Sequence, residues 1–162
     1  MYQHGGEEVT KTVTGAEARG AATVVTVEVS LRKEKGWSEQ LAVSADGVAL
    51  VSLDDVVFDR PAWLLRVKVR AGDRWQAEYA GHAVAVRATT TARGEEVVGV
   101  PAGRFRALRV EAVTVGRPEP RTPRTSAVFF APGVGVVRED VRTVVGNWVT
   151  TGVLKAFSPG KG

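Results

Sequence analysis

The chain has 162 residues, with 22 basic and 18 acidic side chains, a formal net charge of +4 and no cysteine. This length is enough for a single domain with one buried core. The lack of cysteine excludes disulfides, thiolate nucleophiles and cysteine-ligated zinc. No apolar run approaches the roughly 18 residues that a membrane span needs, and residues 1–15 contain no apolar segment of a signal peptide, so we expect a soluble domain.

Apolar and polar residues alternate along most of the chain. In residues 21–35, Val25, Val27, Val29 and Leu31 fall on one face and polar side chains fall on the other, as in a half-buried antiparallel strand. The same alternation recurs at 10–15, 63–72, 82–92, 105–115, 135–145 and 147–157. No segment of twelve or more residues shows a helical stripe, although a short turn is compatible with residues 54–63.

Turn residues separate these runs. Asp46-Gly47 is typical of a two-residue hairpin between residues 36–44 and 48–55, and Arg93-Gly94 marks one of several further bends. We therefore predict an all-β domain with about ten strands, arranged as an up-and-down meander in an antiparallel curved sheet. A sheet of this size protects its edges by curling into a half-barrel or barrel. This single domain is expected over residues 1–157, with a disordered tail over 158–162.

The stretch FFAPGVGVVRED, residues 129–140, contains the most suggestive glycines. A phosphate-binding loop needs a helix after its glycines, because the free N–H groups of the helix bind the phosphate. Residues 136–145 alternate like a strand instead. We interpret Pro132, Gly133 and Gly135 as a bend between two strands, with a positive φ or a bulge at one of the glycines.

Two other motifs are also interpreted as structural turns. In VPAGRF, Pro101 fixes φ at the second position of a turn and Gly103 supplies a permissive backbone. Gly72 and Asp73 mark a further bend at the end of an aliphatic strand.

Catalytic and metal-binding patterns are missing from the sequence. His4 and His82 have no partner at ligand spacing, and an Asp cluster at 54, 55 and 59 lacks the spacing of a calcium loop. Glu139 and Asp140 are adjacent and would face opposite sides of a strand, so they cannot act as a pair. We expect no enzyme activity, no metal and no cofactor. An enzyme of unfamiliar type stays open as a third alternative.

The basic residues do not form a nucleic-acid pattern. Arg66, Lys68 and Arg70 alternate as on the wet face of a strand, without aromatic residues to stack bases. Arg117, Arg121 and Arg124 share a proline-rich stretch that is typical of an exposed loop. Nucleic acid is therefore not expected as a partner.

The aromatic residues supply the candidate binding site. Trp63 and Trp75 flank one predicted strand at an even separation, which places them on one face if the strand is regular. With Phe130, they are the residues that we expect to line an apolar groove if the curved sheet has no lid. The alternative is that the aromatic side chains only fill the core.

Three ordered motifs resemble an uncharacterised family of bacterial envelope proteins. They are Gly-Asp-x-Trp at 72–75, Val-Pro-Ala-Gly-x-Phe at 100–105, and an aromatic pair before Ala-Pro-Gly-Val-Gly-Val-Val at 129–137. The resemblance implies a fold similar to the half-barrels of LolA-like lipoprotein carriers, which bind acyl chains in an apolar concavity. It also implies an extracytoplasmic location, in the periplasm or cell envelope, and an export signal upstream of Met1.

Together these observations favour a non-catalytic, extracytoplasmic β domain. Its expected ligand is apolar or lipid-like and binds on the concave face of the sheet. The alternative is a structural or protein-interaction module of the cell envelope that docks an envelope protein through an open sheet edge, without a small-molecule ligand.

Overall fold

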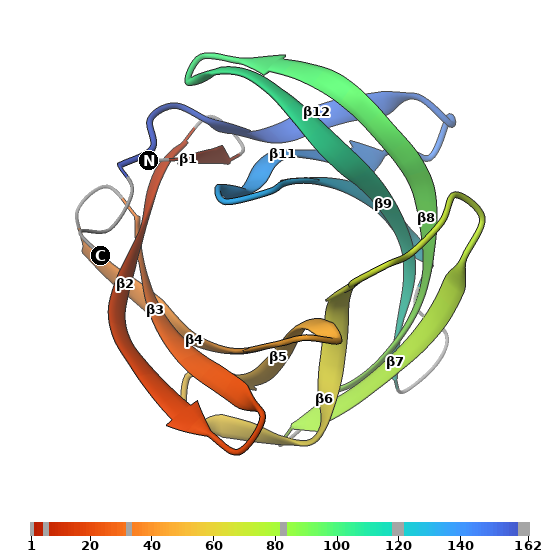
Figure 1. Ribbon diagram of the computed structural model, residues 1–162. Helices are drawn as coiled ribbons and strands as arrows, with labels where there is room; N and C mark the ends of the chain where they lie inside the picture. Colours follow the sequence, from red (N-terminus) through yellow and green to blue (C-terminus); the bar gives the residue numbers. More distant parts are fainter. Residues whose placement is uncertain (1, 5–6, 32–33, 82–83, 118–121, 159–162) are drawn as a thin grey trace.

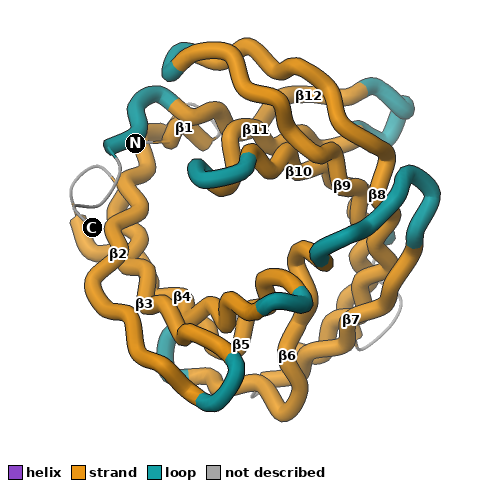
Figure 2. Tube along the Cα trace, in the orientation of Figure 1, coloured by secondary structure: helices purple, strands orange, loops and turns teal. Residues whose placement is uncertain are grey.

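The computed structural model describes residues 2–4, 7–31, 34–81, 84–117 and 122–158. Over these residues the chain is built from strands and turns, without a helix (Figure 2). The strands are β1 (Tyr2–His4), β2 (Glu7–Arg19), β3 (Ala22–Leu31), β4 (Glu34–Ser44), β5 (Gly47–Leu53), β6 (Val56–Arg66), β7 (Arg74–Gly81), β8 (Val84–Val100), β9 (Gly103–Arg117), β10 (Arg124–Ala131), β11 (Gly135–Arg142) and β12 (Trp148–Leu154).

All twelve strands belong to one antiparallel sheet in the order β6-β5-β4-β3-β2-β1-β12-β11-β10-β9-β8-β7. Consecutive strands are neighbours throughout, except that β6 and β7 form the two edges and β12 returns to pair with β1. The short β1 thus joins a half of five strands to a half of six. The sheet curls into a ring that its backbone hydrogen bonds do not close (Figure 1). This confirms the predicted all-β curved meander, with twelve strands in the described residues where about ten were expected.

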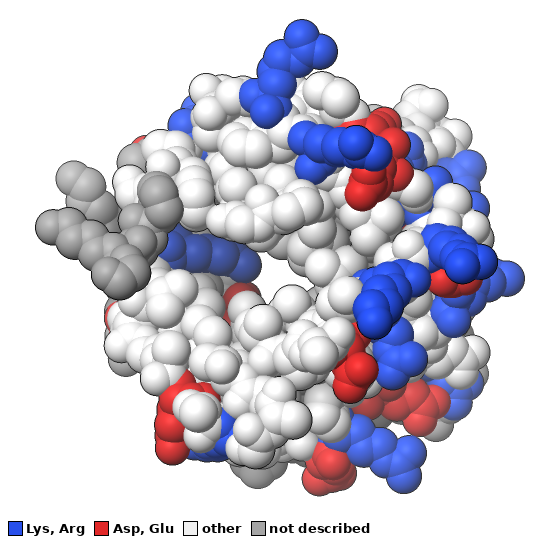
Figure 3. Space-filling model, in the orientation of Figure 1, with Lys and Arg blue, Asp and Glu red and all other residues white. Residues whose placement is uncertain are grey.

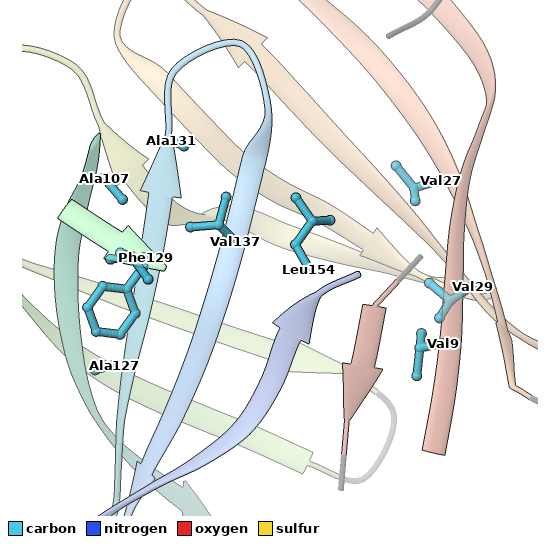
Figure 4. Close-up of a cluster of buried hydrophobic side chains, with 10 residues drawn as sticks. Val9, Val27, Val29, Ala107, Ala127, Phe129, Ala131, Val137 and Leu154 are labelled. Carbon is cyan, nitrogen blue, oxygen red and sulfur yellow. The ribbon is translucent and has the colours of Figure 1, made fainter. Parts of the chain in front are cut away.

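The main core contains buried side chains from both faces of this sheet. Its buried side chains are Val9, Val27, Val29, Val98, Ala107, Ala127, Phe129, Ala131, Val137 and Leu154. Leu154 shares the inner face with Val9 and Val29, because it is linked to them through the pairing of β1 (Figure 4). Phe129 lies on the outer face, because it pairs with Arg138, and Arg138 pairs with Val153, the neighbour of Leu154. Val27 and Val29 are buried, as the alternation in residues 21–35 predicts.

The predicted bend after Ala131 is confirmed. Gly133 and Gly135 have positive φ values of 72° and 96°, and β11 begins at Gly135 without an intervening helix. A β-bulge lies at the same end of β10, between Phe129 and Phe130. This segment therefore shapes the sheet, and it lacks the helix of a phosphate-binding loop.

Three local expectations differ from the structure. The alternation predicted through Gly72 stops at Arg66, where β6 ends, because Lys68 has a φ of 61° that a strand does not accept. Residues 56–63, taken as a turn, belong to β6. Gly94, taken as a bend, is a bulge within the continuous strand β8. His82 and Arg121 lie outside the described residues, as does most of the expected tail.

Gly47 provides a test of the predicted hairpin, which the structure places between β4 and β5. Its φ is 144°, and a Cβ at this position would overlap the carbonyl oxygen of Leu65 on β6. We expect Gly47→Ala to lower the free energy of unfolding by on the order of 2–3 kcal/mol, because both the φ and the overlap must be relieved. Urea denaturation of the wild type and the variant measures this difference in the free energy of unfolding. Gly99→Ala is the control, because Gly99 has open space around its Cβ position; equal losses in the two variants would contradict the account.

Candidate functional site

The hollow inside the ring is the main candidate site. A space-filling view along the ring shows an opening at its centre, with basic and acidic atoms visible inside it (Figure 3). Register assigns further side chains to this inner face, because residues directly opposite each other on antiparallel strands point to the same side. Val13 lies opposite the core residue Val27, yet it is strongly exposed. An exposed apolar side chain on the inner face indicates that the core does not fill the ring.

Another exposed apolar residue shares this inner face. Val43 follows Leu41, which packs on the main core, at the spacing of two that keeps residues on one face. Val43 is exposed. Val113 is also exposed, but it shares its face of β9 with Arg109, which lies on the outer side. The inner wall is therefore partly apolar and accessible at β2 and β4.

One wall carries a polar group on β2 and β4. Glu39 lies opposite Val27, so it faces inward. It accepts a hydrogen bond from the indole Nε1 of Trp37 at 2.9 Å, and its other oxygen lies 3.4 Å from Nζ of Lys11. The single carboxylate is thus held by one indole N–H and one ammonium group.

The outer face of the sheet carries a larger group, which we call the arginine cluster: Arg93, Arg109, Glu111, Arg138 and Asp140. Arg138 pairs with Val153, whereas the next residue, Leu154, shares the inner face with Val9. Asp140 is buried and forms a two-point ion pair with Arg138, with both N–O distances at 2.8 Å. Glu111 accepts from Nη2 of Arg109 at 2.7 Å and from Arg93 at 2.8 Å. Each carboxylate therefore has a guanidinium partner, as buried charges require.

Aromatic rings lie beneath these guanidinium groups. The Phe129 ring centroid is 5.7 Å from Cζ of Arg109 and 5.2 Å from Cζ of Arg138. Arg109 also lies 5.1 Å from the ring centroid of Trp148 on β12. At such distances the ring faces attract the cations, which holds both arginines close to the surface of the sheet.

The sequence interpretation did not identify the arginine cluster. The sequence pattern that could have identified it is the pairing of opposite charges at i, i+2 within strands, in Arg109/Glu111 and in Arg138/Asp140. Such residues share one face of a strand, but the same pattern also occurs on solvated faces, as in Glu17/Arg19. Only the register across β9, β10 and β11 shows that these pairs lie beside the core.

The three residues predicted to bind a ligand lie together. Trp75 is buried in a second core cluster, and Trp63 and Phe130 pack against it. However, Trp63 and Trp75 do not flank one strand: they lie on β6 and β7, the two edges of the sheet. Nε1 of Trp75 donates a hydrogen bond to the carbonyl oxygen of Trp63 at 3.0 Å. The side chain of Trp75 thus ties the two edges together, and ligand binding by Trp63, Trp75 and Phe130 stays a prediction.

The predicted turn residues also occupy bends. Gly72 and Gly103 have φ values of 95° and 136°, and Pro101 lies in the turn between β8 and β9. The Asp73 carboxylate accepts a hydrogen bond from the backbone N–H of Arg70 at 2.7 Å. Asp54 accepts one from the N–H of Ser38 at 2.8 Å, so it links the turn after β5 to β4. Among the described residues, no three His, Asp or Glu side chains are grouped to hold a metal ion.

Replacement of Asp140 tests the arginine cluster. Asp140→Asn removes the negative charge beside Arg138, whose side chain is partly solvated, and we expect a loss of about 1–2 kcal/mol in the free energy of unfolding. Chemical denaturation measures it. Glu95→Gln breaks the exposed pair with Arg106 on the other face of the sheet and is expected to cost less than about 0.5 kcal/mol. Equal losses in Asp140→Asn and Glu95→Gln would show that the buried ion pair stabilises the fold no more than the exposed pair does.

Trp75→Phe tests the tie between the sheet edges. The variant leaves the Trp63 carbonyl oxygen without its donor, and we expect a loss of about 1–2 kcal/mol. Amide hydrogen exchange should become faster in β6 and β7 and stay unchanged in β2 and β3. Uniformly faster exchange in all strands would contradict a local role of this hydrogen bond.

No helix in the described part of the chain is long and apolar enough to cross a membrane. No protein-family model matches the sequence, and no curated protein does either. The family suggested by the three motifs and the likeness to LolA-like carriers therefore stay predictions.

Two solved structures are similar to this chain. One is a protein from Bacteroides fragilis described as exported and as having a YmcC-like fold, with a TM-score of 0.66, 13% identity, and coverage of 96% of this chain and 91% of the other. The second is a protein from Parabacteroides distasonis described as a lipoprotein, with a TM-score of 0.61, 13% identity, and coverage of 91% and 86%. At this identity the similarity shows that the chain shares their fold.

Proposed function

We propose that this protein is a non-catalytic, extracytoplasmic β domain that binds an apolar or lipid-like ligand in the hollow of the ring. The observation that carries the proposal is the exposure of apolar side chains on the inner face, where Val13 and Val43 border the core without being covered. Exposed apolar surface in a concave position is typical of a ligand site.

The proposed location rests on the two similar structures. One of those proteins is described as exported and the other as a lipoprotein. Both descriptions fit a domain that works outside the cytoplasm, as the three sequence motifs also imply. The proposal assigns no catalytic step, because Glu39 on the inner face and Glu111 and Asp140 on the outer face are each engaged by basic partners.

A second candidate function is a protein-interaction module. It is favoured by the edges of the sheet, since β6 and β7 do not pair with each other through their backbones. An unpaired edge can accept a strand from a partner. The hydrogen bond from Trp75 to Trp63 opposes this function, because it holds the two edges against each other.

Ligand binding is tested on the purified protein. Native mass spectrometry should reveal a co-purified apolar molecule, and a neutral fluorescent probe, N-phenyl-1-naphthylamine, should bind with saturation. If neither experiment detects a ligand, the interaction module remains as the function of this fold.

A pair of variants locates the binding surface. Val13→Asp places a charge on the inner face, and we expect it to weaken probe binding on the order of tenfold, because binding then removes a carboxylate from water. Val113→Asp is the control: Val113 is 42% exposed against 64% for Val13, but it shares the outer face of β9 with Arg109. Equal weakening by both variants would place the probe outside the hollow.

A further inference from the structure

The turn between β11 and β12 presents two adjacent apolar side chains to solvent. Val144 is 97% exposed and Val145 is 78% exposed, more than any other large apolar residue in the described part of the chain. The turn lies at the periphery of the ring, away from the central opening (Figure 2). Single apolar residues are common on protein surfaces, but two adjacent ones at the tip of a hairpin point to an interaction site.

Hydrogen bonds within the turn fix its conformation. The backbone N–H of Thr143 donates to the carbonyl oxygen of Asn147 at 2.8 Å, and the N–H of Gly146 donates to the carbonyl oxygen of Thr143 at 2.9 Å. The N–H of Asn147 donates to Oγ1 of Thr143 at 3.2 Å. Several polar groups of the turn are therefore satisfied within it, which lowers the cost of moving the turn out of water.

Two arginines lie beside this turn. Nε of Arg142 donates to the carbonyl oxygen of Gly146 at 3.1 Å, and its Nη2 lies 3.8 Å from the position of a Cβ on Gly146. The guanidinium group is thus held against the turn itself. Arg124 lies two residues before Ser126, whose partner on β11 is Val141. The antiparallel register therefore brings Arg124 next to the start of the turn.

The segments that carry these arginines contain no carboxylate. Residues 141–154 contain Arg142 and no acidic residue, and residues 122–129 contain Arg124 and no acidic residue. Both arginine side chains are exposed. An apolar tip with two cations beside it is complementary to the surface of an anionic bilayer, where charged phosphate groups lie above a hydrocarbon layer.

We propose that the β11–β12 turn docks this protein on an anionic phospholipid bilayer. Val144 and Val145 enter the interface between the head groups and the acyl chains, where their burial is favourable. Arg142 and Arg124 lie at the level of the phosphate groups, which attract them. The attachment is peripheral and reversible, because two valines bury far less apolar surface than a membrane-spanning segment does. This inference is separate from the proposed function, because the turn lies outside the hollow.

Co-sedimentation with vesicles tests the proposal. The full chain is mixed with vesicles of phosphatidylcholine alone, or of phosphatidylcholine with about one third phosphatidylglycerol. We expect the protein to bind the anionic vesicles on the order of tenfold more tightly than the neutral ones, because both arginines gain attraction to the anionic surface. This preference should decrease as salt is added.

A valine variant assigns the apolar contribution to the turn. Val144→Ser combined with Val145→Ser should weaken binding to the anionic vesicles on the order of tenfold, because less apolar surface is buried. Val57→Ser is the matched control, because Val57 is 75% exposed against 78% for Val145. Val57 lies between Asp55 and Asp59 in the sequence, so its surroundings do not suit an anionic bilayer. The control should bind like the wild type.

Arginine variants assign the preference for anionic vesicles. Arg142→Gln combined with Arg124→Gln should reduce this preference to less than about threefold. Arg142→Lys also loses the Nε hydrogen bond but keeps the charge, and it should retain the preference. Val13→Ser changes the hollow without a change of charge and should leave vesicle binding unchanged, which separates this site from the proposed function. Thermal denaturation verifies that each variant is folded.

Three contrary results would overturn the proposal. Equal binding to the two kinds of vesicle, or no binding to either, would exclude docking on an anionic bilayer. Undiminished binding in the paired valine and paired arginine variants would exclude the turn as the docking site. Sedimentation velocity without vesicles tests for a second copy: a wild-type dimer that the paired valine substitutions convert to a monomer would show that another copy of the chain covers the turn.

Discussion

Every part of this fold depends on how a long antiparallel sheet satisfies the backbone hydrogen bonds of its edge strands. The described strands form one row of hydrogen-bonded neighbours that curls into a ring. Within this row β12 pairs with β1, so the first and last strands lie side by side. The remaining opening lies in the middle of the sequence, between β6 and β7. There an indole N–H, donated by Trp75 to the Trp63 carbonyl oxygen, replaces a ladder of backbone bonds. The curvature that brings these edges together also creates the hollow.

The size of the ring explains the unusual composition of its inner face. Side chains fill the interior of a small ring, but a larger ring leaves space at its centre. The structure fills part of that space with Val29, Val137 and Leu154 and leaves Val13 and Val43 accessible. The carboxylate of Glu39 is accepted on the same face because Trp37 and Lys11 engage it. The inner wall at β2 and β4 is therefore mostly apolar with one paired charge.

Much of the fold was predictable because period-two alternation and turn residues are local signals. Val27 and Val29 identified the buried face of β3, and Gly133 with Gly135 identified the bend before β11. The sequence did not show that β1 pairs with β12, because pairing between the ends of a chain has no local signature. The bulge at Gly94 and the end of β6 at Arg66 were also missed, since single residues with unusual backbone angles decide them.

The candidate site was predictable only in part. Trp63, Trp75 and Phe130 do lie together, but the reasoning that placed two of them on one strand was wrong, because the chain turns between them. The arginine cluster was missed because Arg109/Glu111 and Arg138/Asp140 resemble pairs on a solvated face. Alternation assigns residues to the two faces of a strand, but it does not reveal which charged pairs lie beside a core that is built from distant strands.

A crystal structure with a brominated decanoate would test the central claim most directly, because bromine can be located by its anomalous scattering. The account predicts a bromine site inside the ring, beside the exposed apolar side chains of Val13 and Val43. A bromine site outside the ring, or an empty ring at a saturating concentration of the ligand, would contradict it.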